Sequence, residues 1–235
     1  MPSTVLIIGN SDGIGAAVTR TLLALGDRVI GVSRSGSPLG PDGPRHEICD
    51  VTSPEYPDLL ERLIRDEGPF DVCLYCVGIG SALSLPDLSN EAKVIEVNLT
   101  AMVRTLAAVV PEWIERRRGH FVGLSSLADE LYSPEAPSYS ASKAGFSNYL
   151  QGMARALRPH GIAVTNVRFG FVDTKMAKAE RKPLLISPDD AAKHIVRCLE
   201  TRRWQLSIPK VAAAAVGIAG WIQRVRGWAA STRPR

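Results

Sequence analysis

The sequence predicts a three-layer α/β fold: a doubly wound parallel sheet of seven strands in a single domain. Short β-branched apolar segments alternate along the chain with longer segments of helical periodicity, which is typical of a parallel sheet covered by helices on both faces. The 235 residues, 45% of them hydrophobic, are enough for one core of ordinary size. No internal repeat or interdomain linker interrupts the pattern.

Each strand is expected where an apolar segment lies between turn signals. The expected strands are Val5–Ile8, Val29–Ser33, His46–Cys49, Val72–Val77, Phe121–Leu124, Ile162–Arg168 and Trp204–Ile208. Each helix is expected where apolar residues recur every three or four positions. The expected helices are Ala16–Leu25, Pro54–Asp66, Glu91–Arg117, Tyr139–Arg158 and Pro188–Thr201. Gly26 ends the first helix, residues 36–44 form a turn rich in glycine and proline, and Pro111 bends the third helix.

The basic residues are unevenly distributed. The net charge is +4, yet residues 201–235 hold seven basic residues and no acidic one, and the rest of the chain holds 21 basic and 24 acidic residues, a net of −3. A nucleic-acid-binding domain would carry a basic face throughout, so this distribution argues against one. The N-terminus lacks the basic region of a secretory signal, and we therefore expect a cytoplasmic protein.

Cys73 and Cys76 have the spacing of a redox motif but lie in a strand-like segment. Side chains three residues apart on a strand point to opposite faces of the sheet. We therefore expect two buried thiols in the core rather than a dithiol site.

A glycine-rich turn follows the first strand and opens the first helix, which is the context that a phosphate site requires. The glycines allow the backbone to approach a pyrophosphate, and the helix N-terminus offers free N–H groups and a partial positive charge. The expected cofactor-binding residues of the turn are Gly9, Ser11, Asp12, Gly13, Ile14 and Gly15. The alternative is a glycine-rich turn that binds nothing.

The end of the second strand favours NADP(H) over NAD(H). An acidic residue there would accept hydrogen bonds from the free ribose diol of NAD, but the sequence has Ser33 and Arg34. Arg34 carries a permanent charge in a fork suited to a 2′-phosphate. Two considerations keep NAD(H) open: Arg34 is alternatively a solvated surface residue, and the charge of Asp12 would oppose a 2′-phosphate.

Three side chains suited to proton transfer have a characteristic spacing. Tyr139 and Lys143 lie four residues apart, so one helical turn places both on the same face. Ser126 ends a strand-like segment thirteen residues before Tyr139. Taken singly, each has an ordinary structural alternative: a core aromatic, a solvated lysine or a strand-end serine.

Together these residues resemble the short-chain dehydrogenase/reductase family over the chain to about Pro209. The resemblance implies a Rossmann-type sheet in residues 1–209, hydride transfer to or from NAD(P), and a homodimer or homotetramer formed through Glu91–Arg117 and Tyr139–Arg158. It implies that Asn98 is a fourth catalytic residue beside Ser126, Tyr139 and Lys143, and no metal is expected. The further cofactor contacts that it implies are Asp50, Val51, Gly78, Tyr139, Lys143, Gly170, Val172 and Thr174.

Three places depart from the family's usual residues. Ile8 stands where threonine is common, Tyr75–Val77 where two asparagines and an alanine are common, and Phe169 where proline is common. Ile8 and Tyr75–Val77 lose polar ties that usually brace the cofactor loops, and either apolar packing replaces these ties or cofactor affinity is weaker. Phe169 is expected to loosen or reshape the nicotinamide end. None of them removes a reacting group.

The predicted reaction interconverts a small-molecule carbonyl and a secondary alcohol, with Tyr139 as general acid/base. A phenol has a pKa near ~10, and a cation about 4 Å away lowers it by about three units at an effective dielectric near ~20, before desolvation opposes the shift. Lys143 is that cation and, by the resemblance, bonds the ribose hydroxyls. Ser126 holds the substrate oxygen, and Asn98 supports a water that links Lys143 to solvent.

Two other functions were weighed. The first is a non-catalytic redox sensor or scaffold that binds NADP(H) and a protein partner. The second is a sugar-nucleotide epimerase or dehydratase, which the short C-terminal portion disfavours because it leaves little material for a nucleotide-sugar subdomain.

The substrate wall is expected from Gly80–Leu85, Leu131–Pro134 and the short segment Lys175–Ile186. A short lid predicts an open site that tolerates bulky substrates. The basic residues of this lid are Lys175, Lys178, Arg181 and Lys182. They favour an anionic or lipid-bound substrate, or equally a solvated lid.

Residues 210–235 form a basic, apolar C-terminal helix or tail. Its apolar segment 211–222 is too short to span a bilayer, which takes about 20 residues. The aromatic and basic residues at its end are Trp221, Arg224, Arg226 and Trp228. They suit peripheral membrane contact through residues 210–228, or packing on the domain or on a partner subunit, and both interpretations remain open.

Overall fold

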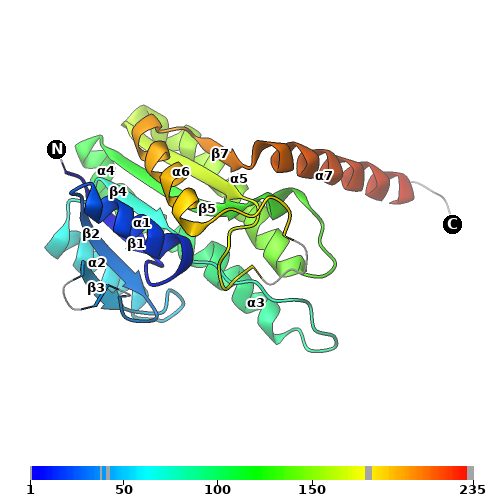
Figure 1. Cartoon of the computed structure of the whole chain (residues 1–235), viewed down its shortest axis with the longest axis horizontal. Helices are drawn as coiled ribbons and strands as arrows, with labels where there is room; N and C mark the ends of the chain where they lie inside the picture. The colour runs from blue at the N-terminus through cyan, green and yellow to red at the C-terminus, as the bar shows by residue number, and fades with distance from the viewer. Residues whose placement is uncertain (1, 38, 41–42, 178–181, 232–235) are drawn as a thin grey trace.

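Parallel strands form one sheet in the order β3-β2-β1-β4-β5-β6-β7 (Figure 1). The computed structural model describes residues 2–37, 39–40, 43–177 and 182–231. Within this part of the chain the seven strands are β1 (Thr4–Ile8), β2 (Arg28–Ser33), β3 (Arg45–Ile48), β4 (Val72–Tyr75), β5 (Gly119–Ser126), β6 (Ile162–Phe169) and β7 (Gln205–Ile208). The predicted fold class is confirmed.

Helices cover both faces of the sheet. The α-helices of the described residues are α1 (Gly13–Ala24), α2 (Tyr56–Glu67), α3 (Ser89–Ile95), α4 (Ala101–Arg116), α5 (Pro137–Leu157), α6 (Pro188–Thr201) and α7 (Lys210–Ser231). Helices α2, α4 and α5 bury their apolar residues on one face, and α1 and α6 on the other. This arrangement gives three layers with α7 extending outward beyond the sheet (Figure 1).

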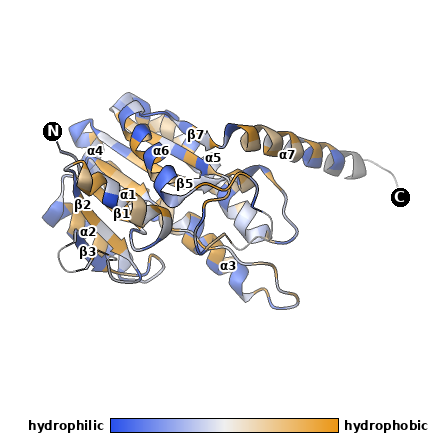
Figure 2. Cartoon of the chain, in the orientation of Figure 1, coloured by the Kyte–Doolittle hydropathy of each residue, from blue (hydrophilic) through white to orange (hydrophobic). Residues whose placement is uncertain are grey.

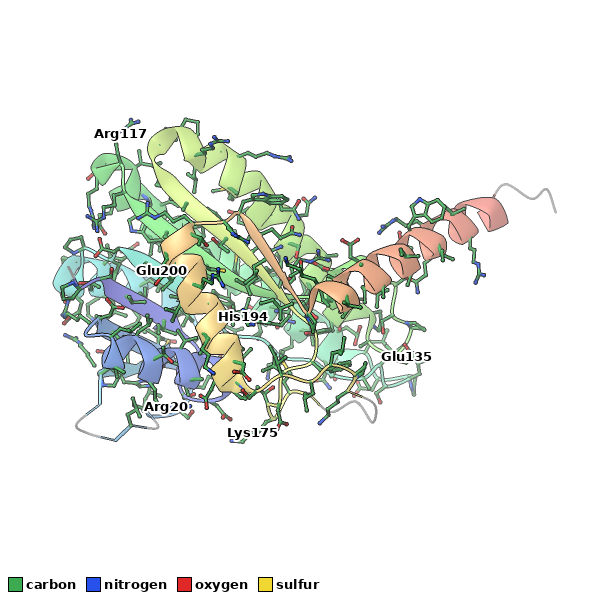
Figure 3. The ribbon with its side chains drawn as sticks, turned by 45° about the horizontal axis from the view of Figure 1, so that its top comes forward. Arg20, Arg117, Glu135, Lys175, His194 and Glu200 are labelled. Carbon is green, nitrogen blue, oxygen red and sulfur yellow. The ribbon has the colours of Figure 1, made fainter. Side chains whose placement is uncertain are left out.

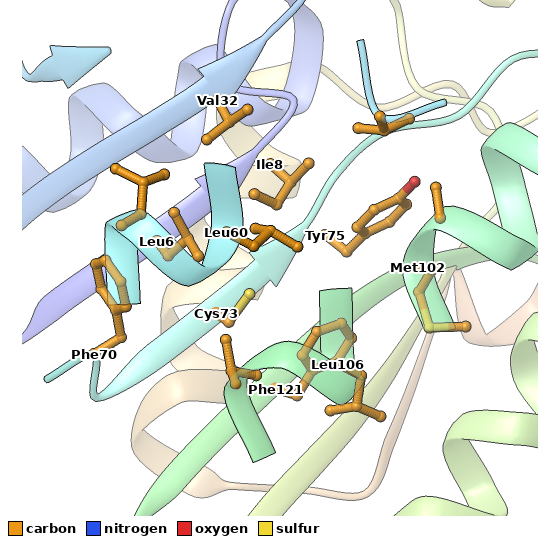
Figure 4. Packing of buried hydrophobic residues seen from close by; sticks show 14 of the residues in the cluster. Leu6, Ile8, Val32, Leu60, Phe70, Cys73, Tyr75, Met102, Leu106 and Phe121 are labelled. Carbon is orange, nitrogen blue, oxygen red and sulfur yellow. The ribbon is translucent and has the colours of Figure 1, made fainter. Parts of the chain in front are cut away.

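The strands bury side chains on both faces, which explains their continuous apolar sequence. In β1, Leu6 and Ile8 join the cluster under α2, α4 and α5, whereas Val5 and Ile7 join the cluster under α1 and α6. Figure 4 shows the first cluster, in which Phe121 of β5 and Leu106 of α4 fill the space between sheet and helices. Sheet and helices therefore share two continuous cores.

The strand order reverses between β1 and β4, which lie next to each other in the sheet. From β1 the strand order runs outward to β2 and β3, and from β4 it runs the other way. In such sheets a crevice opens beyond the carboxyl ends of these two strands, where ligands bind. Gly9 follows β1 and Gly78 follows β4, so both lie at this edge.

The third predicted helix is not continuous. A π-helical turn, Glu96–Thr100, separates α3 from α4, and α4 then continues through Pro111. The change of helical geometry therefore comes at Asn98, whose side chain bonds the backbone of Ile79 in a neighbouring loop. Single π turns of this kind often mark functional sites.

The segment Ser89–Arg116 is long and apolar enough to cross a membrane by length and composition alone. Its apolar residues nevertheless have partners within the domain. Leu106, Val109 and Trp113 are fully or almost fully buried in the core, and the Trp113 indole donates to the carbonyl of Phe70 at 2.7 Å. We therefore describe it as a core helix.

Cys73 and Cys76 point to opposite sides of the sheet, as predicted. Cys73 belongs to the cluster under α2, α4 and α5, and Cys76 packs against the cluster under α1 and α6. Both thiols are free, and burial raises the pKa of Cys73 and raises that of Cys76 to about 12. Neither is suited to thiolate chemistry at neutral pH.

His120 in β5 makes the stability of the fold depend on pH. It is 1% exposed, its Nε2 lies 2.8 Å from Thr165 Oγ1, and burial lowers its pKa from 6.5 to about 4. Because the pKa of His120 is lowered in the folded state, the unfolded chain binds this proton more tightly. The free energy of unfolding is therefore at its full value above pH 6.5 and decreases as the pH falls toward 4. We expect a loss of about 3 kcal/mol over that window.

Urea unfolding on either side of this window measures the loss. His120→Gln should flatten the dependence, whereas the control His160→Gln, at an exposed histidine, should leave it unchanged. Equal slopes for the wild type and His120→Gln would show that His120 is not the titrating group.

Candidate active site

The glycine turn between β1 and α1 is packed so tightly that its glycine positions leave little or no room for a Cβ atom. Gly9 has φ +91° and donates its N–H to the Val32 carbonyl at 2.7 Å. A Cβ at Gly15 would lie 1.9 Å from the Gly9 carbonyl oxygen, and Gly13 has φ +50°. The turn therefore presents bare backbone and the start of α1 at the carboxyl edge of the sheet.

The other residues of the turn have distinct surroundings. Asp12 caps α1, its Oδ1 accepts from the Gly13 N–H at 2.7 Å, and its Oδ2 lies 2.7 Å from Lys175 Nζ (Figure 3 labels Lys175). The hydrogen bond from Lys175 holds the pKa of Asp12 below its ordinary value. The negative charge of Asp12, which would oppose a phosphate, is thus paired with Lys175. Ile14 packs its side chain against the core, which leaves its backbone to face the crevice.

A hydrogen-bonded turn follows β2. The buried hydroxyl of Ser33 donates to the carbonyl of Ser35 at 2.7 Å and lies 3.2 Å from His46 Nε2. Ser35 in turn donates to the hydroxyl of Ser11 at 3.0 Å, which joins this turn to the glycine turn. Ser33 therefore shapes the turn rather than presenting a free hydroxyl. Sequence reasoning missed His46, because a short strand gives no signal of a contact with a residue thirteen positions away.

Arg34 projects from the same turn. Its side chain is 64% exposed, and its Nη1 lies 4.0 Å from Asp50 Oδ2. Burial opposes ionisation of Asp50, but hydrogen bonds from Thr52 at 2.9 and 2.7 Å hold its pKa below the ordinary value. Val51 beside it is buried in the core. The Arg34 guanidinium is thus exposed at this end of the crevice, with the Asp50 carboxylate at the edge of ion-pair distance.

The segment after β6 reaches back to the glycine turn. Gly170 donates to the Ile208 carbonyl at 2.8 Å, and Val172 forms a parallel bridge with Ile186. A Cβ at Gly13 would lie 3.1 Å from the methyl group of Thr174. The structure therefore brings Thr174 beside Gly13 of the turn.

Lys143 lies almost fully inside the molecule, 2% exposed. Its Nζ donates to the Leu124 carbonyl at 2.8 Å and lies 4.9 Å from the centre of the Phe146 ring. A Cβ at Gly78 would be 3.5 Å from this Nζ, so the ammonium lies directly behind the segment that follows β4. Burial lowers the pKa of Lys143 to about 8.

The expectation that Lys143 lowers the pKa of Tyr139 is wrong for this structure. Burial raises the pKa of Tyr139, a hydrogen bond with Ser126 opposes that rise, and the carboxylate of Asp129 adds to it. The Lys143 ammonium is bonded to the Leu124 carbonyl, 6.0 Å from the centre of the Tyr139 ring, so desolvation of the phenol dominates. Tyr139 is therefore protonated at neutral pH, which is the state of a proton donor.

Ser126 lies at the junction of β5 and the 3₁₀ turn η2 (Leu127–Glu130). Its hydroxyl oxygen accepts from the Ala128 N–H at 3.1 Å, which fixes the side chain while leaving the hydroxyl proton free to be donated. The Ser126 side chain also lowers the pKa of Tyr139, so these two predicted residues lie near each other.

Asn98 holds a loop in place. Its Oδ1 accepts from the Ile79 N–H at 2.8 Å, and its Nδ2 donates to the Ile79 carbonyl at 2.9 Å and to Ser142 Oγ at 3.0 Å. The side chain is fully buried, and all three hydrogen bonds are internal. It fixes the segment after Gly78 against α5, next to Lys143; the predicted water-binding role stays a prediction.

Sequence reasoning missed a buried ion pair behind the catalytic side chains. Arg168 of β6 donates to Asp129 of η2 through Nε at 2.6 Å and Nη2 at 2.5 Å, and the two side chains are 9% and 4% exposed. Asp129 also accepts from Ser147 Oγ at 2.5 Å. Its carboxylate raises the pKa of Lys143 against the larger effect of burial. The partners lie 39 residues apart, and no periodicity links them.

One of the segments expected to form the substrate wall, Gly80–Leu85, lies against Tyr139. Leu83 donates its N–H to the Glu135 carbonyl at 2.7 Å, and a Cβ at Gly80 would lie 3.4 Å from the Tyr139 ring. Exposed apolar side chains on these segments are Leu85, Tyr132, Met176, Leu184 and Leu185. These segments therefore present exposed apolar side chains beside the exposed Lys175; Lys178 and Arg181 of the lid lie outside the described residues.

The family departures are accommodated by packing and by one new polar tie. Ile8 and Phe169 are buried in the two cores. The hydroxyl of Tyr75, at the end of β4, donates to the Val97 carbonyl of the π turn at 2.7 Å. Tyr75 thus links β4 to the turn that carries Asn98.

Comparisons with known proteins agree with this geometry. A family model described as short chain dehydrogenase matches residues 3–184. The chain belongs to this family. Among relatives of this short-chain dehydrogenase, an uncharacterized oxidoreductase of Myxococcus xanthus is 32% identical over 226 residues, 88% of this chain and 89% of its own. A 3-oxoacyl-[acyl-carrier-protein] reductase of Vibrio cholerae is 31% identical over 184 residues, 74% of this chain and 75% of its own.

Solved structures share the fold of this short-chain dehydrogenase. One from Streptomyces avermitilis has a TM-score of 0.82 at 24% identity, covering 98% of this chain and 96% of its own. One from Sphingobium yanoikuyae, in complex with NADPH, has a TM-score of 0.81 at 21% identity, covering 100% of this chain and 97% of its own. The family is one of oxidoreductases, so the coarse function predicted from the sequence is confirmed.

Proposed function

We propose that this chain is an NADP(H)-dependent oxidoreductase that interconverts a small-molecule carbonyl and a secondary alcohol, with Tyr139 as general acid/base. The observation that carries the proposal is the convergence of Ser126, the protonated phenol of Tyr139 and the buried ammonium of Lys143, whose Nζ lies 6.0 Å from the centre of the Tyr139 ring. The reductase activity named for the Vibrio cholerae relative supports the same reaction class.

The residues at the carboxyl edge suit a dinucleotide. Gly9, Gly13 and Gly15 form a cradle of bare backbone that a Cβ would fill, and the start of α1 offers free N–H groups to a pyrophosphate. Arg34 suits a 2′-phosphate, and the NADPH in the Sphingobium yanoikuyae structure supports NADP(H) over NAD(H). When bound, NADPH supplies the hydride.

Each catalytic residue then has one task. Ser126 donates a hydrogen bond to the substrate oxygen and holds it within reach of the phenol. Tyr139 gives its proton to that oxygen as the carbon is reduced, and the phenolate regains a proton from solvent. Lys143 offers its ammonium to the ribose hydroxyls, and Asn98 fixes the adjoining loop.

Incubation with NADPH and a panel of carbonyls, chosen with apolar substituents to suit the exposed rim, tests the proposal. Cofactor oxidation that depends on the carbonyl supports a reductase. Tight NADPH binding without turnover of any carbonyl would favour the alternative, a non-catalytic sensor or scaffold.

Arg34 is expected to set the cofactor preference. A charge-assisted hydrogen bond contributes about 1.5–3 kcal/mol, so Arg34→Ala should raise the Kd for NADPH by about 10- to 100-fold and leave the Kd for NADH unchanged. Fluorescence titration with both cofactors measures this. Arg20→Ala, on the outer side of α1 with Asp189 as its partner, is the matched control. Equal weakening of both cofactors by Arg34→Ala would assign the 2′-phosphate to other residues.

We also propose that residues 1–209 act in the cytoplasm as a homodimer or homotetramer formed through α4 and α5. The family resemblance supports this assembly, and light scattering tests it.

A further inference from the structure

Helix α7 is held against the domain by one side only. Its Gly220 packs so closely that a Cβ there would lie 2.1 Å from the Glu130 carbonyl oxygen. Gln223 exchanges hydrogen bonds of 2.9 and 3.3 Å with the backbone of Tyr132, and Arg224 lies 3.5 Å from Glu130. These contacts fix the rotation of the helix, and therefore determine which of its side chains face outward.

The outward side of α7 is apolar. Its exposed side chains are Val211, Ile218, Trp221, Ile222 and Val225, with exposed fractions of 37 to 75%. Their spacing of three, four and seven residues places them on one stripe of the helix. Figure 2 shows hydrophobic residues along this helix, which extends clear of the sheet. Soluble proteins seldom expose such a continuous stripe without a function.

Cations flank this stripe on both sides. At 3.6 residues per turn, Arg226 and Lys210 lie about 80° to either side of Ile218. Residues 201–235 contain no acidic residue. At the base of α7, a hollow of about 400 Å³ between α6 and β7 is lined by His194, Arg197, Arg203 and Lys210, among others (Figure 3 labels His194). The side of the molecule around α7 therefore suits an anionic surface.

We propose that α7 lies flat on an anionic membrane surface. The apolar stripe enters the boundary between headgroups and acyl chains, and the flanking cations bind lipid phosphates. Trp221 suits this depth, because its ring is apolar and its N–H remains hydrated. Since Gln223 is bonded to Tyr132, the rim of the candidate active site then lies beside the lipid.

A second copy of this chain suits the stripe less well. In a two-fold interface the same patch meets itself, so Lys210 and Arg226 of one copy would face the cations of the other with no acidic residue between them. One helix stripe also offers less than the roughly 800 Å² per partner of a stable interface. Anionic lipid instead neutralises the same charges.

Co-flotation of the full chain with vesicles tests the proposal, and it does not depend on catalysis. We expect the protein to float with phosphatidylglycerol vesicles and not with phosphatidylcholine vesicles. Lys210→Gln with Arg226→Gln should lower the partition coefficient by about 30-fold. Ile218→Glu with Val225→Glu should abolish co-flotation, whereas the control Leu25→Glu with Ile48→Glu, at two exposed apolar residues elsewhere, should not.

Two results would overturn the proposal. One is absence of the wild-type chain from the phosphatidylglycerol fraction. The other is an oligomer, measured by light scattering, that dissociates in Ile218→Glu with Val225→Glu while neither protein floats, because the stripe would then be covered by a second copy.

Discussion

Tyr139→Phe is expected to lower kcat/KM for carbonyl reduction by about 10²- to 10⁴-fold, the range of a lost general acid. The ring remains in place while the phenol proton, which burial keeps on the oxygen at neutral pH, is removed. NADPH binding should change little, because the cradle of glycines and Arg34 is untouched. Steady-state oxidation of NADPH measures the first quantity, and fluorescence titration measures the second.

Tyr149→Phe is the matched control for this variant. Tyr149 lies on the same helix, α5, is partly buried and has no assigned hydrogen bond among the described residues. We expect unchanged turnover from it. Undiminished turnover in Tyr139→Phe, with both variants folded, would mean that another group or a water delivers the proton.

The fold could be predicted from sequence because its signals are local. The strands β1 and β4 can be predicted because each is a short apolar segment bounded by turns. The spacing of Gly9, Gly13 and Gly15 predicts the turn. The opposite orientations of Cys73 and Cys76 follow from strand geometry alone. Each conclusion rests on residues within a few positions of each other.

The predictions from sequence were wrong where the structure depends on residues far apart in the chain. The π turn around Asn98 goes with hydrogen bonds to Ile79, which the helical periodicity of Glu91–Arg117 does not reveal. The spacing of Tyr139 and Lys143 gave their common face but not the depth of their burial, which decides the direction of the pKa shift at Tyr139. Burial of the phenol sets that direction, and the Lys143 ammonium, which is bonded to the Leu124 carbonyl, does not offset it.

The ion pair of Asp129 and Arg168, which the sequence did not reveal, is expected to contribute strongly to the free energy of unfolding. Asp129→Ala would leave the Arg168 guanidinium buried without its main partner, since the side chain is only 9% exposed. Breaking a buried pair in this way costs about 3–5 kcal/mol, against about 1 kcal/mol or less for an exposed pair. We therefore expect a large loss of unfolding free energy in urea, and little change for the control Arg20→Ala, which breaks an exposed pair.

A double-mutant cycle separates the pair from its surroundings. Arg168→Met with Asp129→Ala removes both charges, so the combined cost should be well below the sum of the two single costs. Additive costs would show that the two side chains act independently, for instance through Ser147 and Glu130, their other partners. Because Ser126 caps η2 and Glu130 of η2 contacts α7, a strongly coupled pair would mean that η2 is held in place by Arg168 between Ser126 and the outer helix.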